Sequence, residues 1–157
     1  MWATLLVAFT YFCLLSGAEY IINDILDCER DKAHPLKKQR PIASGRLKIR
    51  YALAVALLLI TLSLFGAYFT VNLNFLLISA SYLVLVLAYS LALKHLVFVD
   101  ILTIAAGFVL RAVAGALAIE VFVSPWLIIC TFLLALYLAL EKRWYEIKSL
   151  PNEASSH

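Results

Sequence analysis

The 157-residue chain is 64% hydrophobic and carries a formal net charge of +3. This apolar share is far above that of a soluble globular domain, which excludes an ordinary soluble fold. The basic residues lie in short stretches between apolar segments, at a membrane surface, so the charge does not indicate nucleic-acid binding. A helix of about 20 apolar residues crosses a bilayer, and the chain has room for about five. We predict an all-α integral membrane protein with spans at residues 2–22, 51–70, 75–93, 97–118 and 124–141.

The first span leads into an acidic stretch. Asp24, Asp27 and Asp31 are spaced by three and four residues, which places them within about 60° on one helical face. Like charges on one face repel each other, and a divalent cation would remove that repulsion. Asn23 adds another oxygen ligand at the membrane edge. Hard oxygen ligands suit Mg²⁺, which one or two carboxylates usually hold together with substrate phosphates.

The acidic stretch could also suggest an EF-hand or a solvated helix. An EF-hand is excluded, because its ligands alternate around a central glycine and no glycine lies between Asp24 and Asp31. A solvated helix at the membrane surface, with Arg30 and Lys32 neutralising the acids, remains an alternative.

The residues that follow supply basic donors. Lys37 and Arg40 offer donors for phosphate oxygens. The region therefore predicts a site for a metal ion and a phosphate.

Residues 51–93 contain no Asp, Glu, Lys or Arg. The stretch is about twice the length of one span, so it predicts two helices joined by a turn. Asn72 and Asn74 place that turn, because asparagine favours turns and helix ends. Tyr89 and Lys94 close the second helix; taken singly, they are ordinary interfacial anchors.

Arg111 lies near the middle of the fourth span, where a charge is costly and marks function by default. Asp100 shares its helical face but lies about 16 Å away along the axis, too far for a direct pair. We therefore expect Arg111 to meet a group on another helix, or a phosphate in a polar cavity that Glu19 could also line. The alternative is an arginine satisfied by backbone carbonyls. The small residues of this span favour close helix packing.

The chain ends on a basic segment and a polar tail. Lys142, Arg143 and Glu146 follow the fifth span, and residues 149–157 are expected to fray. In the five-span topology every basic loop falls on one side, whereas the opposite loops carry only Glu120. The positive-inside rule then predicts a multi-pass protein of the cell inner membrane whose basic loops are cytoplasmic.

Two motifs resemble the UbiA-type intramembrane prenyltransferases. The first extends from Asn23 to Gly45 and matches an aspartate-rich motif; the second is Tyr89-Ser90-x-x-Leu93-Lys94. The resemblance covers about residues 10–148. It implies part of a UbiA-type helical bundle, with one transmembrane domain at 1–148, incomplete relative to the family, before the tail.

The resemblance also implies an activity. Aromatic prenyltransferases of the superfamily carry a second aspartate-rich motif where this chain has Lys142 to Glu146. The chain is more similar to the decaprenyl-phosphate 5-phosphoribosyltransferases. That branch implies Mg²⁺-dependent transfer of 5-phosphoribose from phosphoribosyl pyrophosphate to a polyprenyl phosphate at the cytoplasmic face. The implied metal ligands are Asn23, Asp24, Asp27 and Asp31. The three aspartates and Lys94 would be catalytic. Substrate would be bound by Asn23, Lys37, Arg40, Tyr89, Arg111, Lys142, Arg143 and Glu146.

Three alternatives stay open. The main one is prenyl transfer from a prenyl pyrophosphate to an aromatic acceptor, with the same aspartate–metal device. A noncatalytic membrane subunit or a cation carrier is another, although a carrier would place its carboxylates near the bilayer midplane. Because the family has further helices, we also expect either an inactive fragment or assembly, with a completing chain or as a homo-oligomer.

Overall fold

The computed structural model describes residues 1–92 and 97–154. This part of the chain is helical and contains no strand. Five of its helices are long and apolar enough to cross a membrane, which confirms the all-α membrane fold and the five predicted spans. The elements are α1 Trp2–Leu26, α2 Cys28–Ala33, the 3₁₀ helix η1 Lys37–Gln39, α3 Ile49–Thr70, α4 Leu73–Leu91, α5 Val97–Ala118 and α6 Pro125–Ala154.

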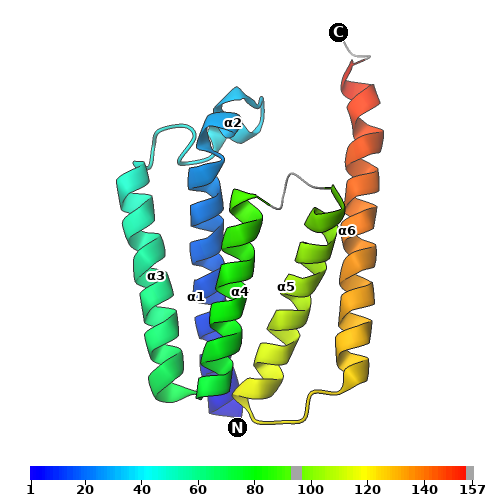
Figure 1. Cartoon of the computed structure of the whole chain (residues 1–157). Helices are drawn as coiled ribbons and strands as arrows, with labels where there is room; N and C mark the ends of the chain where they lie inside the picture. Colours follow the sequence, from blue (N-terminus) through cyan, green and yellow to red (C-terminus); the bar gives the residue numbers. More distant parts are fainter. Residues whose placement is uncertain (93–96, 155–157) are drawn as a thin grey trace.

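Helix α1 is the centre of the bundle. It packs against α3, α4 and α5, while α6 contacts only α5 among the described residues (Figure 1). Alanines fill much of the interface: Ala18 and Ala56 are fully buried and Ala114 nearly so. Small residues let helices approach closely where lipid provides no hydrophobic drive for association. The largest fully buried side chains, Tyr82 and Phe75, lie on α4.

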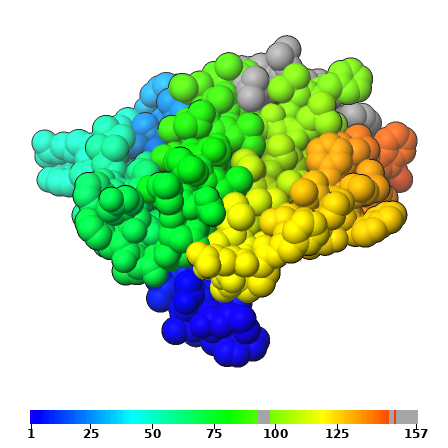
Figure 2. All heavy atoms as spheres, turned by 60° about the horizontal axis from the view of Figure 1, so that its bottom comes forward, coloured from blue at the N-terminus to red at the C-terminus, as the bar shows by residue number. Residues whose placement is uncertain are grey.

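The polar segments gather at one end of the bundle. In Figure 1 the α2 segment, the end of α4, the start of α5 and the end of α6 all lie at the top. The N-terminus, the α3–α4 turn and the α5–α6 connection lie at the other end, which Figure 2 brings forward. The acidic segment and the basic end of α6 therefore lie at the same end of the bundle, as the five-span topology predicted. Lys94 lies outside the described residues.

Asn72 fixes the turn that its sequence predicted. Its side-chain oxygen accepts a hydrogen bond from the Phe75 amide at 2.8 Å, which caps the first turn of α4. Its Nδ2 donates to the Leu117 carbonyl at 2.9 Å, near the end of α5. One side chain thus satisfies backbone groups at two helix ends and ties them together.

The helices extend past several predicted limits. Helix α1 continues four residues beyond the predicted span end at 22, because residues 23–26 have no helix-breaking residue. Helix α6 continues through Ala154, so the first part of the tail that we expected to fray is helical. No glycine or proline interrupts α6 between its first residue and Pro151, so the helix has no reason to end at the membrane surface.

Candidate active site

The acidic segment is a helix with a joint at Asp27. The residue has φ −91° and ψ 1°, and it separates α1 from α2. Hydrogen bonds still cross the joint: the Asp27 amide donates to the Asn23 carbonyl and the Asp31 amide to the Asp27 carbonyl, both at 2.9 Å. The near-helical path keeps Asp24 and Asp31 on one side, as their spacing predicted. Helix α2 ends at Ala33, just before Pro35, because the residue before a proline avoids the helical region.

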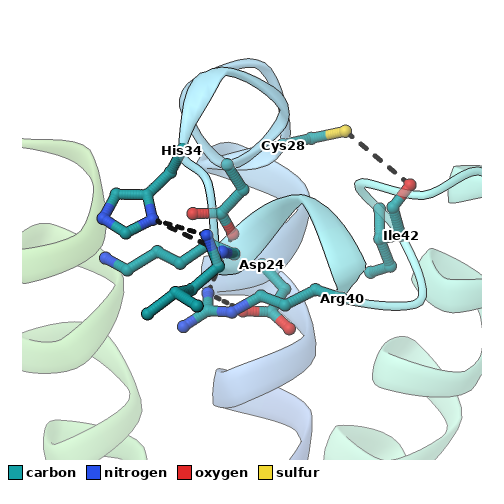
Figure 3. A network of polar contacts seen from close by, with 8 residues as sticks. Asp24, Cys28, His34, Arg40 and Ile42 are labelled. Carbon is teal, nitrogen blue, oxygen red and sulfur yellow. Dashed lines mark hydrogen bonds and ion pairs between the residues drawn. The ribbon is translucent and has the colours of Figure 1, made fainter. Parts of the chain in front are cut away.

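Arg40 joins two of the three aspartates. Its Nη1 donates to Asp24 Oδ1 and to Asp31 Oδ2, each at 2.8 Å (Figure 3). The Asp31 side chain is only 5% exposed, whereas those of Asp24 and Arg40 are about one-third exposed. A carboxylate as buried as Asp31 needs a cationic partner, and Arg40 provides it. The oxygens that could bind a metal ion therefore converge on a position that already favours positive charge.

The loop after α2 sets the position of Arg40. His34 Nδ1 accepts hydrogen bonds from the amides of Leu36 and Lys37 at 3.2 and 3.4 Å (Figure 3). Further on, Ile42 is buried against Cys28 and Ala52, which fixes the loop to the starts of α2 and α3. These contacts return the chain over the acidic segment and place the guanidinium between the aspartates.

The solvated-helix alternative is not what the structure shows for the aspartates. Lys32 pairs with Glu29 at 2.7 Å on the outer side of α2, and this hydrogen bond raises the pKa of Lys32. Arg30 is exposed. The cation that bonds both Asp24 and Asp31 is Arg40, from the following loop. The Lys37 side chain is exposed at the same end of the bundle.

Asp100 is a second meeting point of charged groups. It lies in the first turn of α5, where Tyr89 Oη donates to its Oδ1 at 2.8 Å and Arg143 Nη2 to its Oδ2 at 3.0 Å. These contacts join α4, α5 and α6. The start of α5, which carries Asp100, lies at the same end of the bundle as the acidic segment (Figure 1).

Arg111 meets another helix within the bilayer, as predicted. Its Nη2 donates to the Tyr82 hydroxyl at 2.6 Å, and that hydroxyl donates in turn to Glu19. The guanidinium also lies 5.2 Å from the ring centres of Tyr82 and Phe108. Its Nε is buried and has no hydrogen-bond partner among the described residues. Glu19 and Arg111, on different helices, thus balance each other through one tyrosine hydroxyl.

Two cavities meet at Arg111. A cavity of about 190 Å³ lies between α1, α4 and α5 and is lined by Glu19, Tyr82, Tyr89 and Arg111. A second, of about 530 Å³, follows α1 and is mostly apolar, with Phe9, Phe12 and Phe75 among its lining residues. Tyr20 and Arg111 line both. The two adjoining cavities therefore suit an amphiphile whose anionic head lies near Arg111 and whose apolar tail follows the larger cavity.

The donor set suits a divalent cation that also binds a substrate. Within the described ranges, no three His, Cys, Asp or Glu side chains form a ready metal-binding group. Asp24 and Asp31 provide two converging carboxylates, the number with which Mg²⁺ is usually held when phosphates complete its shell. Asn23 lies half-buried one residue before Asp24.

Three predicted site residues do not belong to these clusters or lie outside the described part of the chain. Lys142 is exposed on α6, the side chain of Glu146 is outside the described part of the chain, and so is all of Lys94. Asp100 and Tyr82 were missing from the predicted site. The sequence did mark Asp100, as an acid on the same helical face as Arg111. It did not mark Tyr82, because a tyrosine within a membrane span is ordinary.

The UbiA prenyltransferase family matches residues 1–148 of the chain. The decaprenyl-phosphate phosphoribosyltransferase of Mycolicibacterium smegmatis is 37% identical over 142 residues, and that of Mycobacterium tuberculosis is 36% identical over 141. Both alignments cover 90% of this chain, but 44% and 46% of the relatives. The digeranylgeranylglyceryl phosphate synthase of Sulfurisphaera tokodaii is 34% identical over 126 residues, or 79% of this chain and 43% of that relative. The chain thus spans less than half the length of these relatives. With five membrane-spanning helices and a family match over nearly its whole length, the chain is a multi-pass membrane protein of the UbiA prenyltransferase family.

Proposed function

We propose that the chain carries the donor-binding part of a transferase that moves 5-phosphoribose from phosphoribosyl pyrophosphate to a polyprenyl phosphate. The observation that carries the proposal is the convergence of Asp24, Asp31 and Arg40 at the polar end of a bundle whose cavities lead to Arg111. The similarity to two relatives named decaprenyl-phosphate phosphoribosyltransferase supports the choice of donor.

Asp24 and Asp31 would hold Mg²⁺ against the pyrophosphate of the donor, with Asn23 and Asp27 beside them. Bound there, the ion would neutralise the charge that develops on the leaving pyrophosphate. Arg40 and Lys37 would donate to phosphate oxygens. The bond between the anomeric carbon and the pyrophosphate breaks as a lipid phosphate oxygen bonds to the same carbon. The lipid phosphate is already an anion, so the chemistry needs no strong general base.

The acceptor would enter from the apolar side. Its tail would lie along the larger cavity and its phosphate would approach Arg111, with Tyr89 at the far wall of the smaller cavity. Arg143, which Asp100 holds, and Lys142, Lys94 and Glu146 would border the donor at the polar end. The positive-inside rule supports a cytoplasmic location for this end, in the inner membrane.

A transfer assay in membranes tests the proposal. Radiolabelled phosphoribosyl pyrophosphate, Mg²⁺ and polyprenyl phosphate are incubated with membranes that contain the chain, and label in the lipid phosphate is measured. Asp24→Asn combined with Asp27→Asn is expected to abolish transfer without loss of expression. Glu29→Gln is the matched control, because it removes an exposed carboxylate of the same segment. Full transfer by the double variant would contradict the proposal.

Prenyl transfer is the second candidate. The Sulfurisphaera tokodaii relative, by its name a digeranylgeranylglyceryl phosphate synthase, gives a specific reason to keep it. A parallel arm of the assay supplies a labelled prenyl pyrophosphate with aromatic acids. Label in an aromatic product, with none transferred from the ribose donor, would favour this candidate.

A further inference from the structure

We propose that Arg40 makes the acidic site selective for a metal–pyrophosphate complex over the free metal ion. In the absence of the anion, its guanidinium competes with a divalent cation for Asp24 and Asp31. When metal and pyrophosphate arrive together, Arg40 leaves the carboxylates and donates to the anion. The inference rests on the proposed function in taking pyrophosphate as the donor's leaving group.

Arg40 competes with a metal ion because its guanidinium already bonds the carboxylates that would bind the ion. A single nitrogen, Arg40 Nη1, bonds one oxygen of Asp24 and one of Asp31 at 2.8 Å. Mg²⁺ held by Asp24 and Asp31 would draw on the same two carboxylates. The guanidinium and the ion therefore compete for their negative charge, and binding of the metal would weaken the hold of the carboxylates on the guanidinium.

The surroundings of Arg40 favour exchange of its side chain over movement of its backbone. The Arg40 amide donates to the Lys37 carbonyl at 3.0 Å, and its carbonyl accepts from the Ser44 amide at 2.8 Å. These bonds hold the main chain in place. The side chain is 38% exposed, so it can turn toward solvent without crossing the packed interior. Asp31 is buried and would be left unpaired, so the guanidinium leaves only as another cation takes its place.

Whether Arg40 weakens or strengthens metal binding depends on whether pyrophosphate is present. A free metal ion must displace a charge-assisted hydrogen-bond donor and gains no other partner for it. A metal ion that arrives with pyrophosphate brings oxygens to which the released guanidinium can donate, and arginine suits phosphate recognition. Arg40 therefore weakens the first event and strengthens the second. By linkage, metal and pyrophosphate each raise the other's affinity through this residue.

Equilibrium dialysis of the full chain in detergent measures this coupling without turnover. The probes are radiolabelled Mn²⁺, as a substitute for Mg²⁺, and radiolabelled inorganic pyrophosphate. Arg40→Gln is expected to bind free Mn²⁺ about tenfold more tightly than the unaltered chain, since a charge-assisted bond no longer competes. It should also lose most of the gain in Mn²⁺ affinity that pyrophosphate gives.

Lys38→Gln is the matched control, because it removes one positive charge from an exposed side chain of the same loop. It is expected to raise Mn²⁺ affinity by less than about threefold, the effect of a screened surface charge. Arg40→Lys keeps the charge without the planar donor pair and should give an intermediate Mn²⁺ affinity. It tests the proposal even if Arg40→Gln fails to fold.

Several outcomes would overturn the inference. They are an Arg40→Gln affinity for free Mn²⁺ equal to that of Lys38→Gln, a weaker affinity than the unaltered chain, and no Mn²⁺ binding by any variant. Because binding and transfer are measured separately, the two proposals can fail separately. Coupling together with label transferred only from the prenyl donor would keep this inference and reject the proposed function.

Discussion

Among the described residues, the hydroxyl of Tyr82 hydrogen-bonds both Glu19 and Arg111, which makes Tyr82→Phe a sharp perturbation. It removes one oxygen from a side chain that is 1% exposed, and it leaves the ring that packs against Phe12. The variant therefore changes polar contacts with little change of volume. Glu19 and Arg111 would then face each other within the membrane without their shared partner.

The expected loss of stability depends on which class of hydrogen bond Tyr82 makes. Interhelical hydrogen bonds in membrane proteins average only about 0.6 kcal/mol and reach about 1.7. Hydrogen bonds to charged groups are stronger, at about 1.5–3 kcal/mol. Tyr82 bonds a charged group on each of two other helices, so the stronger class applies. We expect Tyr82→Phe to lower the free energy of unfolding by about 2 kcal/mol.

The matched control is Tyr11→Phe. Tyr11 accepts a hydrogen bond from the neutral hydroxyl of Thr70 at 3.1 Å on an exposed surface, so the same atom is removed from a bond without charge. It should cost about 0.5 kcal/mol. Both variants are unfolded by SDS titration in mixed micelles and followed by circular dichroism. Equal losses for the two would refute the reasoning and indicate that Glu19 and Arg111 pair directly once the hydroxyl is gone.

Three further predictions concern the helix ends and the topology. Asn72→Ala should destabilise the fold by about 1–2 kcal/mol in the same unfolding titration, through loss of the α4 cap and of the bond to the Leu117 carbonyl; unchanged stability would argue against both bonds. Asp100→Asn should weaken the hold on Arg143, so that limited trypsin digestion cuts the end of α6 several-fold faster than in Glu120→Gln; unchanged rates would argue against that contact. Cysteines introduced by Lys38→Cys and Phe122→Cys should react with an impermeant maleimide from opposite sides of the membrane, the first only from the cytoplasm; labelling from one side alone would reject the topology.

The sequence predicted the five helices well because the bilayer imposes a severe constraint. A charge at the membrane centre is costly, so an uncharged stretch as long as residues 51–93 has few other structures available. Asn72 placed the turn for a local reason, since an asparagine at a helix start satisfies a free amide. The limits of α1 and α6 were less predictable. Hydropathy marks where a helix leaves the apolar region, whereas the helix itself continues until a residue breaks it.

The site was predictable only where local geometry fixed it. The spacing of Asp24 and Asp31 determines their common face, and the structure keeps them together. Their partner was not determined by spacing, because Arg40 lies in a loop whose return depends on the packing of Ile42 against Cys28. A guanidinium at the end of a long side chain can reach many acids. Which one it meets is decided by tertiary structure.

The three arginines of the candidate site share one arrangement, which bears on how it would bind anions. Arg40 bonds Asp24 and Asp31, Arg143 bonds Asp100, and Arg111 reaches Glu19 through Tyr82; each set joins different helices or loops. In a low-dielectric bundle an unpaired charge is costly, so these acids stabilise the fold by balancing the cations.

The same pairing means that an anionic substrate must draw each guanidinium away from a carboxylate, or share it. Two or three phosphate groups that bind together can do this more effectively than one, because each displaced acid is offset by a new contact and a single bound molecule supplies them all. A site built in this way favours a ligand with several phosphates over a single inorganic phosphate. Under the proposed function, phosphoribosyl pyrophosphate, with three phosphoryl groups, and a polyprenyl phosphate in the adjoining cavity would together match its cations.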